Sequence, residues 1–316
     1  SARKQGITFN SPEIDIDKVR KNKERVVKIL TSGLGQLAAR RKVEFIRGSG
    51  HFIDSHQIEV ERHDGDKQQI EFEHAIIATG SSAAPFPGPA PDSERIMFSR
   101  QALEFEGIPE SLLVIGGGYI GLEMGSIYAA LATEVSVAEL LPEILPGADQ
   151  DLVRVFKRKA RSLFSKIMTS TKITRLEADE DGVDVQYEDK KGDADSARFS
   201  KVLITIGRVP NTENLGLEHT GVSIDGKGFI KVDEKLQTGE SHIFAIGDVI
   251  GGAMLAHKAT YEGKMAVRNI RGAGRSSNPV IPAVLFTDPE ITWCGLTEEE
   301  AEEQSLDVSV PRFNWG

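Results

Sequence analysis

Three glycines with the spacing G-x-G-x-x-G, Gly116, Gly118 and Gly121, are the residues of this sequence with the clearest chemical meaning. They follow an apolar run at 112–115 and precede an apolar stretch that continues to Leu131. Between a strand and a helix, this spacing allows a tight turn, close approach of the backbone to a pyrophosphate, and close packing of the helix on the strand. The free N–H groups at the start of the helix favour phosphate charge. The segment therefore predicts a dinucleotide site rather than an ordinary glycine-containing turn.

An acidic residue, Glu139, ends the next expected strand, 134–138, about 20 residues after this loop. A carboxylate in this position accepts hydrogen bonds from both hydroxyls of the adenosine ribose and repels a 2′-phosphate. The following segment, 140–146, contains no arginine. The pattern favours NAD over NADP, against the alternative that Glu139 is a solvated charge at the end of a strand.

A second carboxylate, Asp248, follows the mostly apolar run 243–247. Because ligands of doubly wound sheets collect at the carboxyl ends of the strands, this pattern predicts a second ligand-binding carboxylate. The alternative role, in which Asp248 caps the next helix, is compatible with binding.

The composition excludes several classes of protein. The chain has 316 residues, of which 39% are hydrophobic and 27% charged, and its net charge of -10 opposes binding to nucleic acid. No run approaches the roughly 18 apolar residues of a membrane span, and the first residues lack the apolar core of a signal peptide. We therefore expect a cytoplasmic protein without nucleic-acid or membrane partners. Its single cysteine, Cys294, and the absence of ligand spacing among its seven histidines predict no disulfide and no metal site.

The elements that must position these residues occur twice along the chain. A long amphipathic helix is expected at 15–41. It is followed by short strands at 43–46, 51–53, 57–61 and 69–72, which return into a buried strand ending at Gly80. After a proline-rich linker at 85–91, the unit with the glycine loop begins. Strands at 172–176, 183–187 and 198–206 form a second meander, which returns into a strand ending at Gly207.

The repeat provides an internal measure of distance. Gly116 precedes Gly207 by about 90 residues, and the same distance counted back from Gly80 falls before Ser1. We therefore expect the opening βαβ unit of the first dinucleotide domain to lie outside residues 1–316. The expected fold class is α/β with two Rossmann-like dinucleotide-binding domains, the first incomplete and the second complete, both with inserted β-meanders.

Taken together, the motifs resemble those of the FAD/NAD-linked disulfide oxidoreductases. The matching stretches follow the order of the family over nearly the whole chain, at 76–81, 114–125, 143–149, 205–211, 242–248, 254–258 and 286–290. The resemblance implies an FAD-binding domain in two parts, 1–96 and 232–279, an NAD-binding domain at 97–231, and the start of an α+β dimerisation domain at 280–316.

The resemblance also implies which residues contact each cofactor. Those implied for FAD are Gly50, Thr79, Gly80, Ser81, Asp248, Leu255, Ala256 and His257, with Asp248 bonded to the ribityl chain. Those implied for NAD are Gly116, Gly117, Gly118, Tyr119, Ile120, Gly121, Glu139, Ile173, Gly207 and Arg208. Two roles for Tyr119 stay open, because it either covers the nicotinamide pocket or only packs against the core.

The activity that the resemblance implies is oxidation of dihydrolipoyl groups of 2-oxo acid dehydrogenase complexes, through a redox disulfide and FAD, with reduction of NAD. The protein would be a homodimer with the lipoyl domain of such a complex as partner. Alternatives are another family member, similar to a transhydrogenase or a mercuric reductase, and an NAD-binding fragment without activity.

Some of the family's catalytic residues have no match in this sequence. The redox cysteine pair and the His-Glu base are absent, and Cys294 matches a packed position of the dimerisation domain. Glu123 matches a supporting glutamate near the flavin–nicotinamide contact, and without its usual lysine we expect it to be protonated or solvated. Its alternative role is that of an ordinary residue on a helix surface. The chain alone is therefore expected to be inactive.

Overall fold

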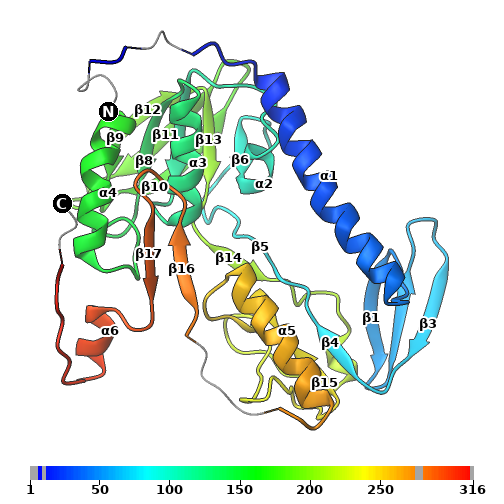
Figure 1. Cartoon of the computed structure of the whole chain (residues 1–316). Coiled ribbons are helices and arrows are strands. Elements are labelled where there is room, and N and C mark those ends of the chain that lie inside the picture. Colours follow the sequence, from blue (N-terminus) through cyan, green and yellow to red (C-terminus); the bar gives the residue numbers. More distant parts are fainter. Residues whose placement is uncertain (1–5, 9–11, 275–279, 314–316) are drawn as a thin grey trace.

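The computed structural model describes residues 6–8, 12–274 and 280–313. At its centre lies a five-stranded sheet with the strand order β6-β13-β7-β8-β9 (Figure 1). Every neighbouring pair of strands in this sheet is parallel. The strands are β6 (Ile96–Phe98), β13 (Lys201–Ile204), β7 (Ser111–Ile115), β8 (Glu134–Ala138) and β9 (Lys166–Met168). The expectation of an α/β fold with a parallel sheet is confirmed.

Helices cover one face of this sheet. They are α2 (Ser99–Ala102), α3 (Tyr119–Ala130) and α4 (Gln150–Leu163). Leu112 and Val114 of β7 are fully buried on this face, in one core with Leu122 of α3 and Phe156 of α4. Because α3 is apolar on most of its surface and α4 on one side only, α3 lies deep in the core and α4 lies at its edge.

An antiparallel meander covers the opposite face. It consists of β10 (Lys172–Ala178), β11 (Val183–Glu188) and β12 (Ala194–Phe199). Leu113 and Ile115 of β7 pack here with Val183 and Val185. Alternate residues of β7 thus enter two different cores, and this burial on both faces explains why the run 112–115 is apolar without interruption.

A second, smaller core is built in a similar way. Its elements are β1 (Ser49–Asp54), β2 (Gln57–Glu61), β3 (Lys67–Glu71), β4 (Ala75–Ile77), β15 (Ile243–Ala245), the 3-10 helices η2 (Leu217–His219) and η3 (Gly247–Ile250), and the helix α5 (Ala256–Ile270). The strands β1 to β3 form an antiparallel meander, and the chain returns into β4, which pairs with β15 in parallel. Phe52, Ile77 and Ile243 are buried between these elements. The meander β1 to β3 leads into β4, as the meander β10 to β12 leads into β13, and both β4 and β13 pair with parallel strands. The same arrangement therefore occurs twice, as the repeat predicts.

A short antiparallel pair joins the two halves. The strand β5 (Ser81–Ala83) pairs with β14 (Arg208–Pro210). β5 begins directly after Gly80, and β14 begins directly after Gly207. These glycines end the two segments that return from the meanders. The two returns, which are distant in the sequence, consequently lie side by side.

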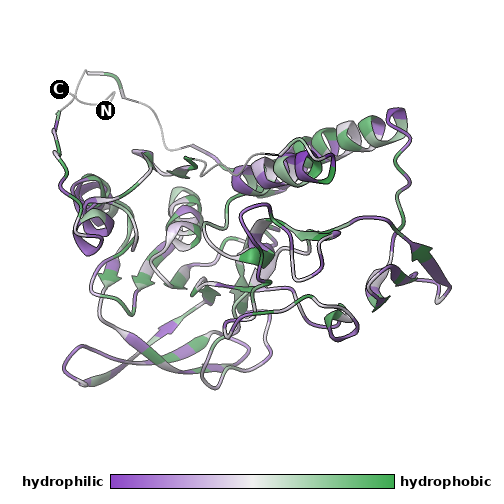
Figure 2. Ribbon diagram, turned by 90° about the horizontal axis from the view of Figure 1, so that it is seen from below, coloured by the Kyte–Doolittle hydropathy of each residue, from purple (hydrophilic) through white to green (hydrophobic). Residues whose placement is uncertain are grey.

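The expected amphipathic helix is α1 (Ile16–Arg40). Its N-cap is Asp15, whose carboxylate accepts the Lys18 N–H at 3.0 Å. Near this end, Arg20 Nε donates to the Glu104 carbonyl at 3.1 Å, and Lys23 also bonds to this segment. No residue of α1 is buried, and Figure 2 shows apolar residues along the helix as well as in the central sheet. The contacts that anchor α1 therefore lie in its first turns, where these polar bonds are joined by Ile16, which packs against the main core.

The last elements pack onto the helical face of the central sheet. They are β16 (Pro282–Leu285), β17 (Ile291–Cys294) and α6 (Glu298–Glu303). Leu285 and Ile291 are buried in the same core as α3 and α4. Thr297 and Glu300 form a capping box, in which the Thr297 N–H donates to Glu300 Oε2 at 2.8 Å. A threonine N-cap with a glutamate three residues later therefore begins α6.

Within the described ranges, no helix combines the length and the apolar character needed to cross a membrane. Among the same residues, no three His, Cys, Asp or Glu side chains are placed to hold a metal ion together. The thiol of Cys294 is free and exposed on β17.

The strand expected at 43–46 was wrong. The meander begins only at Ser49, and the side chains of Val43 and Phe45 are exposed. The Val43 N–H donates to the Ala38 carbonyl at 3.0 Å, so it closes the last turn of α1 instead of joining a sheet. Apolar composition alone indicates a strand only where a neighbouring strand is available.

The strand expected at 198–206 is divided at Ser200 into β12 and β13. The Ser200 N–H donates to Ser111 Oγ at 2.9 Å, where the chain leaves the meander for the parallel sheet. The sequence shows one apolar stretch here because both strands bury side chains in the same core.

The substitution Phe156→Ala should lower the free energy of unfolding by about 3–5 kcal/mol, because the ring is fully buried between α4 and the sheet. The neighbouring Val155→Ala is the control, since Val155 is 42% exposed, and should cost less than about 1 kcal/mol. Urea unfolding followed by circular dichroism measures both. Similar losses in the two variants would contradict the burial of this side of α4.

Candidate functional site

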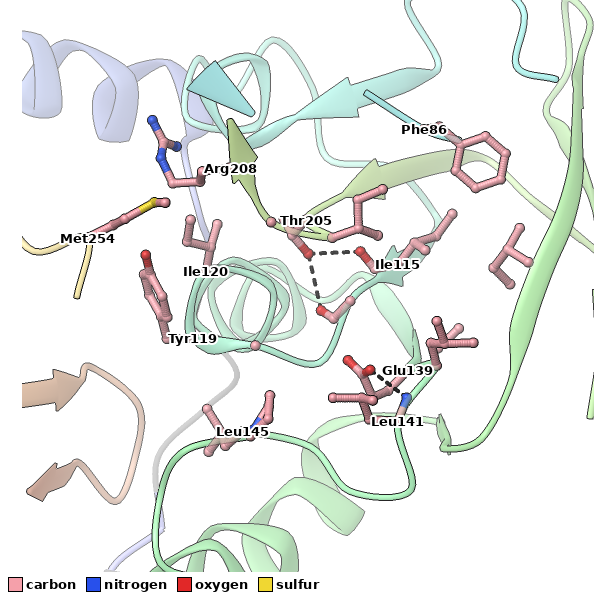
Figure 3. A pocket seen from close by; sticks show the side chains of 18 of the residues that line it. Phe86, Ile115, Tyr119, Ile120, Glu139, Leu141, Leu145, Thr205, Arg208 and Met254 are labelled. Carbon is pink, nitrogen blue, oxygen red and sulfur yellow. Dashed lines mark hydrogen bonds between the residues drawn. The ribbon is translucent and has the colours of Figure 1, made fainter. Parts of the chain in front are cut away.

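A cavity of about 780 Å³ lies at the carboxyl ends of the central parallel strands (Figure 3). Its walls are the glycine loop between β7 and α3, the segment 139–141 after β8 and the segment 205–208 after β13. Ligands of doubly wound sheets bind at this edge, and the volume is typical of cofactor sites. All the residues predicted for NAD line the cavity except Gly117 and Gly121. Segments far from the loop also contribute to the lining, with Phe86, Pro87, Met254 and Trp293.

The glycines of the loop meet three different geometric requirements. Gly116 has a φ of +107°, and a Cβ there would lie 2.7 Å from the carbonyl carbon of Thr205. A Cβ on Gly121 would lie 2.6 Å from Thr205 Oγ1 and closer still to the Gly116 carbonyl oxygen. At Gly118, the N-cap of α3, a Cβ would meet no atom within 4 Å. Gly116 and Gly121 thus permit the turn and the close packing of α3, whereas Gly118 faces space that a ligand can occupy.

The carboxylate of Glu139 is bound to the loop. Its Oε2 accepts the Gly117 N–H at 2.6 Å, and its Oε1 accepts the Leu141 N–H at 2.8 Å. Glu139 is only 8% exposed and lies in the cavity wall (Figure 3). It is therefore not a solvated charge at the end of a strand. A carboxylate has about four acceptor positions, so two bonds leave capacity for ligand hydroxyls.

Two further residues of the cavity lining, Leu145 and Thr205, bond to the backbone of the loop. The Leu145 N–H donates to the Gly117 carbonyl at 2.9 Å, and Leu145 has a φ of +54°. Thr205 Oγ1 lies 3.0 Å from the Ile115 carbonyl and 3.1 Å from the Gly116 carbonyl (Figure 3). Thr205 begins one of the family motifs, which could have identified it. A positive φ at a leucine has no signal in the sequence.

Residues predicted for the two cofactors form one hydrogen-bonded group. Ser81 Oγ donates to Asp248 Oδ2 at 2.5 Å and accepts Arg208 Nε at 2.6 Å. A terminal nitrogen of Arg208 donates to the Ser81 carbonyl at 2.6 Å, and Arg208 Nε lies 3.7 Å from Asp248 Oδ2. Arg208 therefore lines the cavity and contacts the second carboxylate at the same time, which the sequence did not indicate.

The turn before Ser81 is held by Asn211. Asn211 Nδ2 donates to the Thr79 carbonyl at 2.9 Å, and Thr79 Oγ1 donates to the Asn211 carbonyl at 2.7 Å. The Asn211 N–H donates to the Gly80 carbonyl at 3.0 Å. Hydrogen bonds thus connect the segment 79–80, after β4, to Asn211, which follows β14. Asn211 was not predicted to have a role, although it ends the motif 205–211.

The remaining residues predicted for FAD lie in two places. Leu255 is the N-cap of α5 and makes no side-chain cap bond, so the first N–H groups of the helix, including those of Ala256 and His257, lack a side-chain acceptor from it. The His257 ring is hydrogen-bonded to the Pro282 carbonyl. Gly50 pairs with β2 in the outlying meander, and Figure 1 shows β1 apart from β5 and β14. The structure does not bring Gly50 to Ser81.

Tyr119 and Glu123 are both near the cavity end of α3. Tyr119 lines the cavity and also packs on the core, so its contacts are not limited to packing. Burial raises the pKa of its phenol, and the charge of Arg208 partly opposes this. Glu123 Oε1 accepts the Phe286 N–H at 2.8 Å. This bond links α3 to the C-terminal hairpin, and the Glu123 side chain remains partly exposed.

These residues fit the two dinucleotides that the resemblance implies. The open approach at Gly118 and the buried acceptor at Glu139 suit a pyrophosphate and an adenosine ribose. On the side proposed for flavin, Asp248 follows the carboxyl end of β15, and the N-terminus of α5 has no side-chain cap. A carboxylate acceptor and free N–H donors are what polyol and phosphate groups need.

Two family profiles match the chain. The profile of the pyridine nucleotide-disulphide oxidoreductases matches residues 4–263, and the profile of their dimerisation domain matches residues 281–316. The chain belongs to this family. The resemblance stated from the motifs is confirmed.

Similar curated proteins are dihydrolipoyl dehydrogenases. The protein of Haemophilus influenzae is 42% identical over 315 residues, which are 99% of this chain and 66% of that protein. The protein of Geobacillus stearothermophilus is 39% identical over 313 residues, with the same shares of the two chains. The chain thus spans about two thirds of the length of these relatives.

Two solved structures have a similar fold. LpdA from Mycobacterium tuberculosis superposes with a TM-score of 0.87 at 27% identity, over 96% of this chain and 67% of that chain. The HOCl-induced flavoprotein disulfide reductase RclA from Escherichia coli gives a TM-score of 0.81 at 27% identity, over 92% and 66%. The likeness therefore includes the C-terminal hairpin as well as the central sheet.

Two alanine substitutions should separate packing from ligand approach. Gly121→Ala should lower the free energy of unfolding by about 1–3 kcal/mol, because its methyl group would meet the Gly116 carbonyl. Gly118→Ala should leave the stability nearly unchanged but weaken NADH binding about tenfold, because its methyl group would enter the open side of the cavity. Thermal unfolding and NADH fluorescence titration measure the two effects.

The control for these variants is Gly35→Ala on α1, where a Cβ would meet no atom within 4 Å. It should leave NADH binding unchanged and stabilise the helix by about 0.5–1 kcal/mol. Unimpaired NADH binding by Gly118→Ala would contradict the position of the phosphates.

Proposed function

We propose that this chain provides the NAD site and flavin-side residues of a dihydrolipoyl dehydrogenase. In this reaction, dihydrolipoyl groups of 2-oxo acid dehydrogenase complexes are oxidised through a redox disulfide and FAD, and NAD is reduced. The observation that carries the proposal is the buried Glu139 carboxylate, bonded to the glycine loop in a cavity of cofactor size. The names of the relatives at 39–42% identity supply the substrate.

In the proposed NAD site, each group of the chain has a distinct task. The Glu139 carboxylate accepts ribose hydroxyls and excludes a 2′-phosphate by charge. The N–H groups at the start of α3, beside Gly118, bind the pyrophosphate. Ile173 and Gly207 line the cavity beside the dinucleotide, and Arg208 and Tyr119 lie at the end of the cavity nearest to Asp248. NAD, when bound, accepts the hydride.

In the proposed flavin site, Asp248 binds a hydroxyl group of the cofactor, and Ser81 and Arg208 orient its carboxylate. FAD, when bound, supplies two-electron transfer between the disulfide and NAD. The other residues proposed to contact it are Thr79, Gly80, Leu255, Ala256 and His257, whereas Gly50 lies apart from them in β1. Because Arg208 lines the NAD cavity and bonds to Ser81, the chain connects the two sites directly.

The proposal also includes the organisation of the whole protein. Residues 97–231 would form the NAD domain, 1–96 and 232–279 the flavin domain, and 280–316 the start of the dimerisation domain of a homodimer. The lipoyl domain of a 2-oxo acid dehydrogenase complex would be its substrate-bearing partner, in the cytoplasm. Support for this division comes from the central sheet, whose strands lie between Ile96 and Ile204, and from the dimerisation profile.

Glu139→Ala should weaken NADH binding about tenfold, because it removes a charged acceptor of ribose hydroxyls, and it should reduce the preference for NADH over NADPH. The control is Glu134→Ala, at the exposed opposite end of the same strand, which should change neither affinity. Fluorescence titrations with NADH and NADPH measure the change. Unchanged affinities in Glu139→Ala would count against the NAD site.

The purified chain should show no reduction of NAD by dihydrolipoamide, because its single cysteine cannot form the redox disulfide. It should contain less than one FAD per chain, since the flavin-side parallel ladder of the described residues has only the strands β4 and β15. A flavin absorbance scan and a coupled NADH assay test both points. Robust turnover would require another thiol pair, whereas NADH binding with no response to added FAD would favour an NAD-binding module.

A further inference from the structure

Two charged side chains of α5 are almost buried outside the cavity described above. Lys258 Nζ lies 2.7 Å from Glu262 Oε1, and the side chains are 12% and 10% exposed. The order, with lysine before glutamate, is the less favourable one for pairs on a helix. Burial of an ion pair also costs desolvation that its attraction often fails to offset. Stabilisation of α5 is therefore a weak explanation for this pair.

The other bonds of the pair go to the backbone at the two ends of η3. Glu262 Oε2 accepts the Gly247 N–H at 2.7 Å, and Lys258 Nζ donates to the Gly251 carbonyl at 2.9 Å. Both glycines have positive φ, +77° at Gly247 and +78° at Gly251. The chain thus bends at each end of η3 through a conformation that few residues adopt, and one member of the pair holds each bend.

Asp248 lies between these two bends, directly after Gly247. Its carboxylate accepts the Ser81 hydroxyl, so its orientation is defined from one side by Ser81 and from the other by the backbone of η3. The position of that backbone depends on Gly247 and Gly251, and therefore on α5, which runs between β14 and β15 (Figure 1). A displacement of either bend would move the Asp248 carboxylate away from Ser81.

We propose that Lys258 and Glu262 are positioning residues that hold η3 and thereby set the affinity for flavin without touching it. Neither residue lines the cavity, and both act through the Asp248 carboxylate. This inference rests on the proposed function, in which Asp248 binds a hydroxyl group of FAD. A hydroxyl bound to a carboxylate is sensitive to small displacements, because hydrogen bonds weaken steeply with poor alignment.

The first experiment tests, without any cofactor, whether Lys258 and Glu262 hold η3 in place. It measures amide exchange of the full chain by hydrogen–deuterium exchange and mass spectrometry. Glu262→Ala removes the acceptor of the Gly247 N–H and should speed amide exchange in 247–251 about tenfold, with no change in 111–115. Glu262→Gln keeps an oxygen acceptor and should restore most of the protection. Unchanged exchange in 247–251 would overturn the proposal, whether or not flavin binds.

Two further variants make this experiment independent of the stability of Glu262→Ala. Lys258→Met removes the donor to Gly251 and leaves Glu262 in place, so it should speed exchange in the same segment. Lys264→Met is the matched control, because Lys264 is an exposed lysine on the same helix, and it should leave exchange in this segment as in the unmodified chain.

The second experiment is a flavin titration arranged as a double-mutant cycle. Lys258→Met should weaken FAD binding about tenfold and NADH binding less than about twofold. In an Asp248→Asn background, Lys258→Met should cause no further loss of FAD affinity, because it acts through Asp248. Independent, additive losses would show a merely structural role and overturn the proposal. Absence of FAD binding in the unmodified chain would instead overturn the flavin part of the proposed function. The exchange experiment would still show whether Lys258 and Glu262 hold η3 in place.

Discussion

The arrangement of the NAD side depends on one close approach, that of α3 to β7 at the glycine loop. A Cβ at Gly121 would collide with the Gly116 carbonyl, so the helix lies nearer to the strand than any other residue would allow. The N-terminus of α3 therefore opens directly onto the cavity, and the Gly117 N–H reaches the Glu139 carboxylate at 2.6 Å. With a larger separation, the N–H groups at the start of α3 and the Glu139 carboxylate would no longer lie in one wall of the cavity.

The flavin side depends on a different kind of constraint, a set of polar bonds between segments that are distant in sequence. Ser81, Arg208 and Asp248 each come from a different segment, and their bonds lie at the junction of the two halves. Among the described residues, no buried side-chain nitrogen or oxygen lacks a partner, and α5 contributes by bonding to both ends of η3. Such networks specify one arrangement because each unpaired member would cost desolvation energy.

The predictions that succeeded rest on local signals. The loop glycines act within a few residues, so their spacing alone predicts the tight turn and the close packing of α3. The predictions that failed concern pairing. The apolar segment 43–46 has no neighbouring strand among the described residues, and the segment 198–206 changes partners at Ser200. Strand pairing is a property of two segments, and one segment cannot show it.

The sequence by itself determined the family, the parallel sheet, the repeat of meander and return, and the positions along the chain of the two carboxylates proposed to bind the cofactors. The tertiary structure decided what those carboxylates contact. It placed the Phe286 N–H on Glu123, bonded Leu145 and Thr205 to the backbone of the loop, and brought Arg208 to Asp248. These contacts connect residues far apart in the chain, and their geometry depends on distances of a few tenths of an ångström. Periodicity and motif spacing carry no information on that scale, because only the packing of complete elements defines it.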